Sequence, residues 1–178
     1  MNTAVLVIDV QQGLCEGEGA PHDCEGTISR INDVTRKARA AGAPVVFIQH
    51  EAADYLDHGS AGWQLANGLD VKATDIKVRK TTPDSFLRTD LEVVLKERDI
   101  QNVVVCGMHS EFCVDTTVRR ALSLGLPVVL VADAHTSAGN AAISAQQVIA
   151  HHNATLTNIS SFGPRVRAIA STDVQFAA

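Results

Sequence analysis

Four runs of consecutive apolar residues constrain this chain more than any other feature of its sequence. The first is TAVLVIDV over residues 3–10, and similar runs begin at Pro44, Asn102 and Pro127. Such runs, rich in valine and isoleucine, are typical of strands buried on both faces of a parallel sheet. Two weaker candidates are DIKVRK from Asp75 and ATLTNI from Ala154. We therefore expect a mostly parallel sheet of about six strands.

Helical patterns separate these runs. Apolar residues share one face over residues 28–38, and further stripes cover residues 91–95, 114–122 and 142–151. Thr89 and Glu92 have the spacing of a capping box for the second of these helices. Alternating strands and helices imply an α/β fold, a Rossmann-like three-layer α/β/α sandwich with right-handed crossovers. The sequence contains no linker or low-complexity segment, so we expect a single domain over residues 1–178.

Charge and hydropathy exclude several classes of partner. The formal net charge is −5, and no cluster of lysine and arginine is larger than pairs such as Arg119–Arg120, so no electrostatic surface for nucleic acid or an anionic membrane is visible. No stretch approaches the roughly 20 apolar residues of a membrane span, and the first ten residues lack the pattern of a signal peptide. We therefore expect a cytoplasmic protein without nucleic-acid or membrane partners.

Reactive side chains gather where the expected strands end. They are Asp9, His50, Glu51, Lys80, Cys113, Asp133 and His135. Ligands of open parallel α/β sheets bind beyond the carboxyl ends of the strands, although polar residues are also common there because loops border solvent. The segment from about residue 52 to residue 74 is longer than ordinary connections, and loops of this length in compact domains are often functional.

Taken separately, Asp9 and Lys80 favour different interpretations, a functional one for Asp9 and a structural one for Lys80. Asp9 is a carboxylate at the end of a buried strand, between Ile8 and Val10, where it needs partners to offset its desolvation. This setting favours a functional role for Asp9. Lys80 follows Arg79, and strand alternation places these two side chains on opposite faces. Taken alone, Lys80 fits a solvated basic strand end better than a catalytic site.

The four cysteines lie in different settings. Cys113 follows an expected strand, in HSEFCVDTT, and with Ser110 as N-cap it occupies position N3 of the next helix. A helix N-terminus and a nearby ammonium lower the pKa of a thiol, so Cys113 is the candidate nucleophile. Cys106, inside an apolar strand, should behave as a small hydrophobic residue. Cys15 and Cys24 flank an acidic glycine-rich loop; unpaired thiols are the favoured interpretation there, and a redox pair or weak metal site the alternatives.

Three motifs occur in an order that resembles one known family. They are VLVIDVQQGL, VRKTTPDSF and VVVCGMHSEFCVDTTVRRALSLGLPVVLVADAHTS. Over essentially its whole length the chain resembles the isochorismatase-like cysteine hydrolases. The resemblance implies a catalytic triad of Asp9, Lys80 and Cys113, which makes Lys80 a much stronger candidate. It also implies a cis peptide bond between Met108 and His109, with the backbone N–H groups of His109 and Cys113 forming an oxyanion hole.

The sequence departs from the family's patterns around the thiol and after the second strand. Many relatives have threonine where this chain has Ser110, and His109 is not a residue that the family fixes. Nicotinamidase-like members bind a metal through an Asp-x-His cluster, which FIQHEAADYLDH does not reproduce. Other conceivable ligands without a firm template are His50, Asp54, Asp57 and His58. We therefore expect neither a metal nor a cofactor.

The retained cysteine points to attack on an acyl carbon, because members that act on the vinyl ether of isochorismate lack it. The resemblance then implies hydrolysis of a C–N bond in a small amide, ureide or lactam through a thioester. Asp9 would accept the Cys113 proton while Lys80 stabilises the changing charge. Two alternatives stay open: isochorismate-type vinyl ether hydrolysis, and a catalytically silent α/β binding protein.

Candidate substrate-binding residues lie on loops at the same rim, where each is also compatible with simple packing. They are Trp63, His50, Phe86, Phe112 and His135. Trp63, alone among glycines, is the best candidate for a pocket wall. The expected partners are a small-molecule substrate and further copies of the chain, since the resemblance implies a homodimer or homotetramer.

Overall fold

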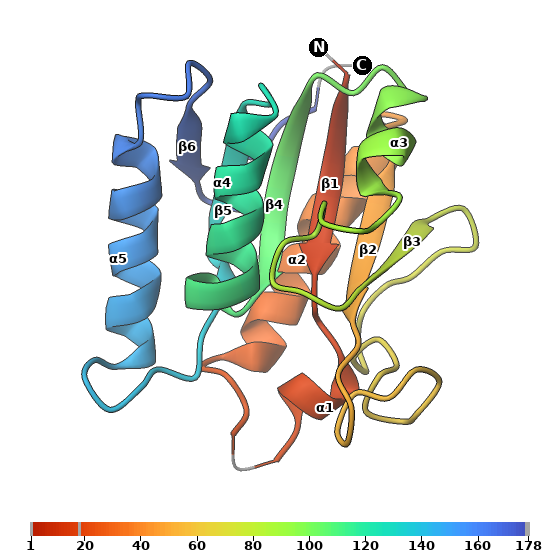
Figure 1. The fold of residues 1–178 in the computed structure, drawn as a ribbon, viewed down its shortest axis with the longest axis vertical. Coiled ribbons are helices and arrows are strands. Elements are labelled where there is room, and N and C mark those ends of the chain that lie inside the picture. Colours follow the sequence, from red (N-terminus) through yellow and green to blue (C-terminus); the bar gives the residue numbers. More distant parts are fainter. Residues whose placement is uncertain (1, 18, 177–178) are drawn as a thin grey trace.

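The computed structural model describes residues 2–17 and 19–176 and contains a six-stranded sheet. Its strands are β1 (Thr3–Ile8), β2 (Val45–His50), β3 (Ile76–Lys80), β4 (Asn102–Met108), β5 (Val128–Thr136) and β6 (Val166–Ile169). Neighbouring strands are parallel and lie in the order β3-β2-β1-β4-β5-β6 (Figure 1). This arrangement confirms the expected α/β fold with about six strands.

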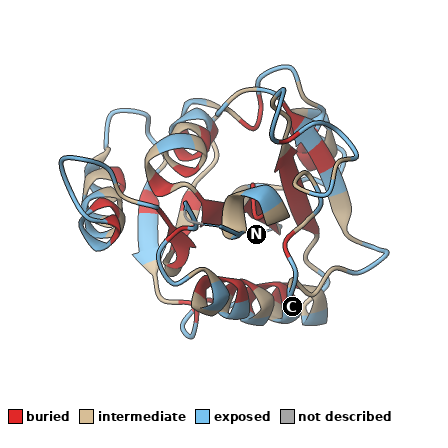
Figure 2. Ribbon diagram, turned by 90° about the horizontal axis from the view of Figure 1, so that it is seen from below, coloured by how far each residue is buried: buried red, intermediate tan, exposed pale blue. Residues whose placement is uncertain are grey.

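Helices cover both faces of the sheet. They are α1 (Gln12–Cys15), α2 (Cys24–Ala40), α3 (Leu91–Lys96), α4 (Asp115–Ser123) and α5 (Ala145–Asn158), with a π-helical turn, η1 (Ser110–Val114), leading into α4. One apolar cluster lies between the sheet and α2, and a second lies between the sheet and α3, α4 and α5. Seen from below in Figure 2, the buried residues line the sheet and the helix faces turned towards it. None of the described helices is long and apolar enough to cross a bilayer.

The continuous apolar run of β1 follows from these two clusters. Val5 and Val7 pack on the α2 side, whereas Leu6 and Ile8 pack on the opposite side. Because side chains alternate along a strand, a central strand with two covered faces needs apolar residues at every position. The same rule explains the runs in β2 and β4.

The expected strand from Ala154 is wrong, because this segment forms the last turns of α5. A capping box between Ser144 and Gln147 starts that helix. Within residues 154–159 only Leu156 is buried. A helix that buries one face suits this segment better than a strand does, despite its β-branched threonines. The sixth strand is β6 instead, further along the chain.

The capping box expected at Thr89 and Glu92 is also wrong. The N-cap residue of α3 is Asp90, whose side chain makes no cap hydrogen bond. Thr89 Oγ1 donates to Ser85 O at 2.6 Å and accepts from Leu91 N at 3.3 Å rather than from Glu92 N. The Glu92 carboxylate pairs with Lys96 on the exposed helix face, so the reciprocal bonds of a capping box are not formed.

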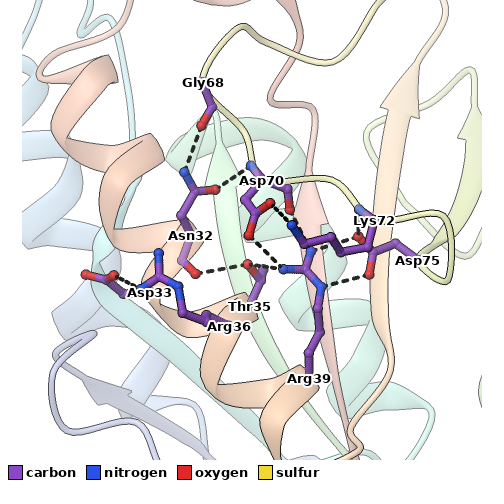
Figure 3. Close-up of polar contacts among 9 residues, drawn as sticks. All are labelled: Asn32, Asp33, Thr35, Arg36, Arg39, Gly68, Asp70, Lys72 and Asp75. Atoms are coloured by element: carbon purple, nitrogen blue, oxygen red, sulfur yellow. Dashed lines mark hydrogen bonds and ion pairs between the residues drawn. The ribbon is translucent and has the colours of Figure 1, made fainter.

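Polar contacts with α2 anchor the second half of the long loop between β2 and β3 (Figure 3). The Asn32 side chain donates to Gly68 O and accepts from Asp70 N, both at 2.8 Å. Arg39 binds Asp75 with two hydrogen bonds, of 3.0 and 2.7 Å, and the Asp75 side chain is 2% exposed. Two-point Arg–carboxylate pairs are among the strongest polar contacts in proteins, so they fix the return of the loop to β3.

Candidate active site

Asp9 lies directly after β1, at the centre of the carboxyl edge of the sheet. Its backbone is left-handed, with φ of 53°, and its N–H donates to Ile48 O at 2.9 Å. The side chain is 2% exposed. Asp9 Oδ2 accepts from Lys80 Nζ at 2.7 Å, whereas the buried Oδ1 has no hydrogen-bond partner among the described residues. One carboxylate oxygen is therefore held in place while the other is open to a proton donor.

Lys80, the last residue of β3, points inward as strand alternation predicts. Its neighbour Arg79 points outward and pairs with Glu51. The Lys80 side chain is fully buried. Its Nζ lies 2.7 Å from Asp9 Oδ2, 3.0 Å from His50 Nδ1, 3.1 Å from Thr82 O and 3.2 Å from Cys113 Sγ. Because a buried charge is tolerated only when it is paired, this ring of acceptors shows why a lysine can occupy the position.

Close approach of β4 to β1 brings the turn that carries the thiol towards Asp9. Gly107 pairs with Ile8 and has φ of 119°, a conformation that L side chains rarely adopt. A Cβ at Gly107 would lie 2.1 Å from Ile8 O, well inside van der Waals contact. Only glycine fits there, and the strand ends of Asp9 and Met108 stay adjacent as a result.

Cys113 lies in the π-helical turn η1, between β4 and α4. The N-cap of this turn is His109, whose carbonyl accepts from Phe112 N at 3.1 Å and Val114 N at 3.3 Å. The expectation that Ser110 is the N-cap and Cys113 is N3 is therefore wrong by one residue, and the Ser110 hydroxyl caps nothing. The wider turn ends β4 and leads into α4, with the Cys113 sulfur next to Lys80 Nζ. Turns of this kind often occur at functional sites.

The thiol of Cys113 is protonated in this site. Burial, followed by the negative charge of Asp9, raises the pKa of Cys113 to about 12, and these effects outweigh the lowering by Lys80. The expectation of a lowered pKa is wrong because the ammonium is already paired with Asp9 and the sulfur is removed from solvent. A thiol in this state reacts only when a base takes its proton, and Asp9, whose Oδ1 has no hydrogen-bond partner among the described residues, lies in the same cluster.

His50 completes the cluster at the end of β2. Burial, followed by the charge of Lys80, lowers the pKa of His50, so the ring is neutral at pH 7. Since Nδ1 faces the ammonium at 3.0 Å and accepts from it, the ring proton is assigned to Nε2. Gln11 fixes the strand end, because its side chain donates to His50 O at 3.0 Å and accepts from His50 N at 2.7 Å.

The side chains conceivable as metal ligands do not assemble as the sequence suggested. In residues 2–17 and 19–176, the one group of three such side chains is Asp9, His50 and Cys113, with ligand atoms within 4.8 Å of one another. Lys80 Nζ lies within 3.2 Å of an atom from each of them. The alternative set of His50 with Asp54, Asp57 and His58 forms no such group. The ammonium thus takes the place where these donors converge.

A buried relay holds the start of η1 against β5. Ser110 Oγ lies 2.7 Å from His135 Nδ1, and His135 Nε2 lies 3.0 Å from Asn153 Oδ1. Asn153 Nδ2 donates to Ala132 O, so its Oδ1 accepts from His135 Nε2–H, and the hydroxyl of Ser110 donates to Nδ1. The Met108–His109 peptide bond just before this contact is cis. The relay connects η1 to α5.

The five candidate substrate-binding residues lie in unlike environments. His50 belongs to the cluster around Lys80, and Phe112, 58% exposed, lies beside Cys113 in η1. Trp63 packs edge-on against His58, with ring centroids 4.6 Å apart, and its buried Nε1 has no hydrogen-bond partner among the described residues. Phe86 is part of the core on the α4 side. His135 is 1% exposed and uses both ring nitrogens in the relay, so neither is available to a substrate.

Several residues of the site were missed from the sequence. Gln11, fully buried, also donates to Trp63 O at 2.9 Å and so ties the long loop to β2. Glu111 accepts from Ser137 Oγ at 2.7 Å, and its other buried oxygen has no hydrogen-bond partner among the described residues. Asn153 fixes His135 from α5. A polar residue two positions after Asp9 was the one available signal, for Gln11; nothing local marks Asn153, which is far away in sequence.

Comparisons with known proteins show which family this chain resembles. Residues 3–163 match the family described as Isochorismatase domain. The chain is 32% identical to the uncharacterized isochorismatase family protein YecD of Escherichia coli O157:H7, over 94% of this chain and 92% of that protein. It is 30% identical to the ureidoacrylate amidohydrolase RutB of Agrobacterium fabrum, over 74% of this chain and 75% of that protein.

A solved structure supports the same assignment. The crystal structure of an isochorismatase family protein superimposes with a TM-score of 0.88 and 32% sequence identity, covering 95% of this chain and 98% of the other. The match of the family over most of the chain, the fold and the related sequences lead to one conclusion. This chain belongs to the isochorismatase family of hydrolases.

Proposed function

We propose that this chain hydrolyses a C–N bond of a small amide, ureide or lactam, with Cys113 as the nucleophile. The observation that carries the proposal is the convergence of three groups. Lys80 Nζ contacts both Asp9 Oδ2 and Cys113 Sγ, and the second oxygen of Asp9 has no partner among the described residues. A protonated thiol beside an unpartnered carboxylate oxygen is a nucleophile together with its base. The relative named as an amidohydrolase supports an amide-type substrate.

In the proposed first half-reaction, Asp9 takes the Cys113 proton as the sulfur attacks the carbonyl carbon. Because the pKa of the thiol is raised to about 12, attack and proton transfer must be coupled; a preformed thiolate would be scarce. Lys80 stabilises the negative charge as it moves between sulfur and carboxylate. The backbone N–H groups of His109 and Cys113 would bind the oxyanion, at about 3 to 4 kcal/mol for each donor.

Asp9 then returns its proton to the leaving nitrogen, and the tetrahedral intermediate collapses to a thioester, which ends the first half-reaction. Asp9 then activates a water molecule that hydrolyses the thioester and restores the thiol. From an open-chain substrate, ammonia or a small amine leaves first and the acid second; from a lactam, the freed amine stays in the product. Each step uses protein groups alone, so the proposal includes no cofactor.

Three of the candidate residues suit the substrate pocket of this proposal. The buried Trp63 Nε1–H has no partner among the described residues, and a buried donor of this kind is costly unless something accepts its proton. His50 offers Nε2–H, because Nδ1 faces Lys80. Phe112 adds an exposed apolar surface next to the thiol. We propose that the two N–H groups orient a polar substrate while Phe112 covers it.

Ammonia release from a panel of primary amides and ureides, together with mass-spectrometric detection of ring opening for lactams, tests the proposal. Cys113→Ala should abolish release from the substrate that the wild-type protein turns over, while Cys106→Ala, which changes a core cysteine, should keep it. Hydroxylamine should trap the thioester of wild-type protein as a hydroxamate. Release that survives in Cys113→Ala would rule out the nucleophile.

The same variants separate the alternatives. Isochorismate-type vinyl ether hydrolysis requires that Asp9→Asn abolish turnover and that Cys113→Ala spare it. A catalytically silent binding protein requires binding of a small molecule without product in any variant. We also propose a homodimer or homotetramer, which a sizing column with light scattering would test, and a cytoplasmic location, which fractionation would test.

A further inference from the structure

The relay behind η1 contains three polar side chains that take no part in the proposed chemistry. Ser110 begins η1, three residues before Cys113, while His135 lies near the end of β5 and Asn153 lies in α5. Ser110 is fully buried and His135 is 1% exposed. Buried polar groups are costly unless each finds a partner, and apolar residues of similar volume often pack as stably. Packing alone therefore does not explain why polar residues occupy these three positions.

Asn153 sets the direction of the hydrogen bonds in the relay. Ala132 O can only accept, so the amide nitrogen of Asn153 faces it at 2.9 Å, and Asn153 Oδ1 faces His135 Nε2 at 3.0 Å. The ring proton is therefore on Nε2, and the bare Nδ1 accepts from the Ser110 hydroxyl at 2.7 Å. Burial lowers the pKa of His135, which keeps the ring neutral at pH 7. Without the amide, the ring would be free to carry its proton on either nitrogen.

The relay holds η1 at its first residue. Ser110 follows His109, whose carbonyl accepts the first hydrogen bonds of the turn. Gly107 pairs with His135 across β4 and β5, so the strand that receives the Ser110 hydroxyl flanks the end of the strand from which η1 starts. Buried networks in which every member is satisfied rigidify the segments that they join. The relay thus ties the beginning of η1 both to the sheet and to α5.

We propose that Asn153 is a positioning residue: through the relay it holds the Cys113 sulfur and the oxyanion-binding N–H groups in the geometry for attack. This inference rests on the proposed function, which assigns those N–H groups to His109 and Cys113. The two residues lie on either side of Ser110 in the chain, so a shift of Ser110 moves the donors and the sulfur relative to the substrate. Misplacement of reacting groups by about 1 Å lowers a rate on the order of 100-fold.

A double-mutant cycle in amide turnover tests the inference. Asn153→Leu and Ser110→Ala should each lower kcat by roughly 10- to 100-fold, with a smaller change in KM, because the long loop and β2 are not part of the relay. Since both variants break one chain of hydrogen bonds, adding Asn153→Leu to Ser110→Ala should lower kcat no further. Ser110→Thr keeps the hydroxyl and should retain most of the kcat. Asn158→Leu is the matched control: its side chain bonds Ala154 O on the exposed face of α5, and kcat should be unchanged.

The tautomer of His135 is a second readout, which does not depend on turnover. Nitrogen NMR of protein with isotope-labelled histidine should show the wild-type ring proton on Nε2 alone, and His135→Gln identifies the signal. In Asn153→Leu both tautomers should be populated. If the wild type turns over no amide, the hydrolase proposal fails by itself, and the rate at which iodoacetamide labels Cys113 replaces kcat in the same cycle. Loosening of η1 should then make labelling faster in either single variant, without a further gain in the double variant.

Three outcomes would overturn the inference. They are additive losses of kcat in the double variant, a kcat of Asn153→Leu equal to that of the wild type, and an unchanged His135 tautomer in Asn153→Leu. A lowered melting temperature with kcat intact would assign the relay to folding alone. Thermal unfolding establishes that each variant is folded at the assay temperature, and Asn153→Ala repeats the cycle with a smaller side chain where leucine prevents folding.

Discussion

Asp9→Asn should make the Cys113 thiol more reactive towards an alkylating agent while it abolishes amide turnover. The carboxylate oxygen and the sulfur lie within 4.8 Å of each other. At that distance a unit charge contributes about 3.5 kcal/mol with an effective dielectric constant of about 20, which corresponds to roughly 2.5 in pKa. Removing the charge should therefore lower the pKa of Cys113 from about 12 to roughly 9.5.

The rate of alkylation should rise less than the fraction of thiolate. At pH 8 that fraction increases on the order of 300-fold for such a change in pKa. Nucleophilicity falls with pKa, with a Brønsted coefficient of about 0.4 to 0.5, so the net gain is roughly twentyfold. Turnover is nevertheless lost, because asparagine cannot accept the thiol proton. Faster alkylation of Cys113 together with lost turnover is the result expected if Asp9 is the base and its charge also keeps the thiol protonated.

The assay is the second-order rate of iodoacetamide labelling from pH 6 to pH 10. It is carried out in a Cys15→Ser, Cys24→Ser background so that labelling reports Cys113. Glu51→Gln is the matched control: it removes a carboxylate at the same rim that pairs with Arg79, and its profile should match the background protein. Labelling of Asp9→Asn that is slower than that of the background protein, or equal to it, would refute the reasoning.

Three further perturbations follow from the same geometry. Lys80→Met should lower the free energy of unfolding, measured in urea, by about 3 to 5 kcal/mol, because it leaves the buried Asp9 carboxylate without a counter-charge. A urea midpoint equal to that of the wild type would contradict the buried pair. Gly107→Ala should destabilise the protein by more than about 4 kcal/mol or prevent folding, since a Cβ would lie 2.1 Å from Ile8 O; soluble protein of normal melting temperature would show that β1 and β4 are further apart. Burial lowers the pKa of His135, so the unfolded state binds more protons below about pH 6.5 and stability should fall there as pH falls. His135→Gln should make this slope shallower in unfolding measured between pH 5 and pH 7.5, and an unchanged slope would assign it to other groups.

The sequence alone was sufficient for the layers and for five of the six strands, but not for β6. Strands buried on both faces must be apolar at every position, so the runs in β1, β2, β4 and β5 were visible without any partner. The strand from Ala154 was wrong because its β-branched threonines carry a local preference, while the buried face of α5, which decides the element, is set by packing against the sheet.

For the site, the sequence determined which residues lie at strand ends, and the resemblance named Asp9, Lys80 and Cys113. Only the tertiary structure decided their electrostatic state. The pKa of the Cys113 thiol depends on how much solvent is removed and on which charge lies nearest, and both are set by segments distant in the chain. The same is true of the contact between Ser110 and His135, since β5 brings the histidine to the start of η1 and their spacing in the sequence does not reveal it. Local patterns specify elements, whereas burial and distance exist only once the elements have packed.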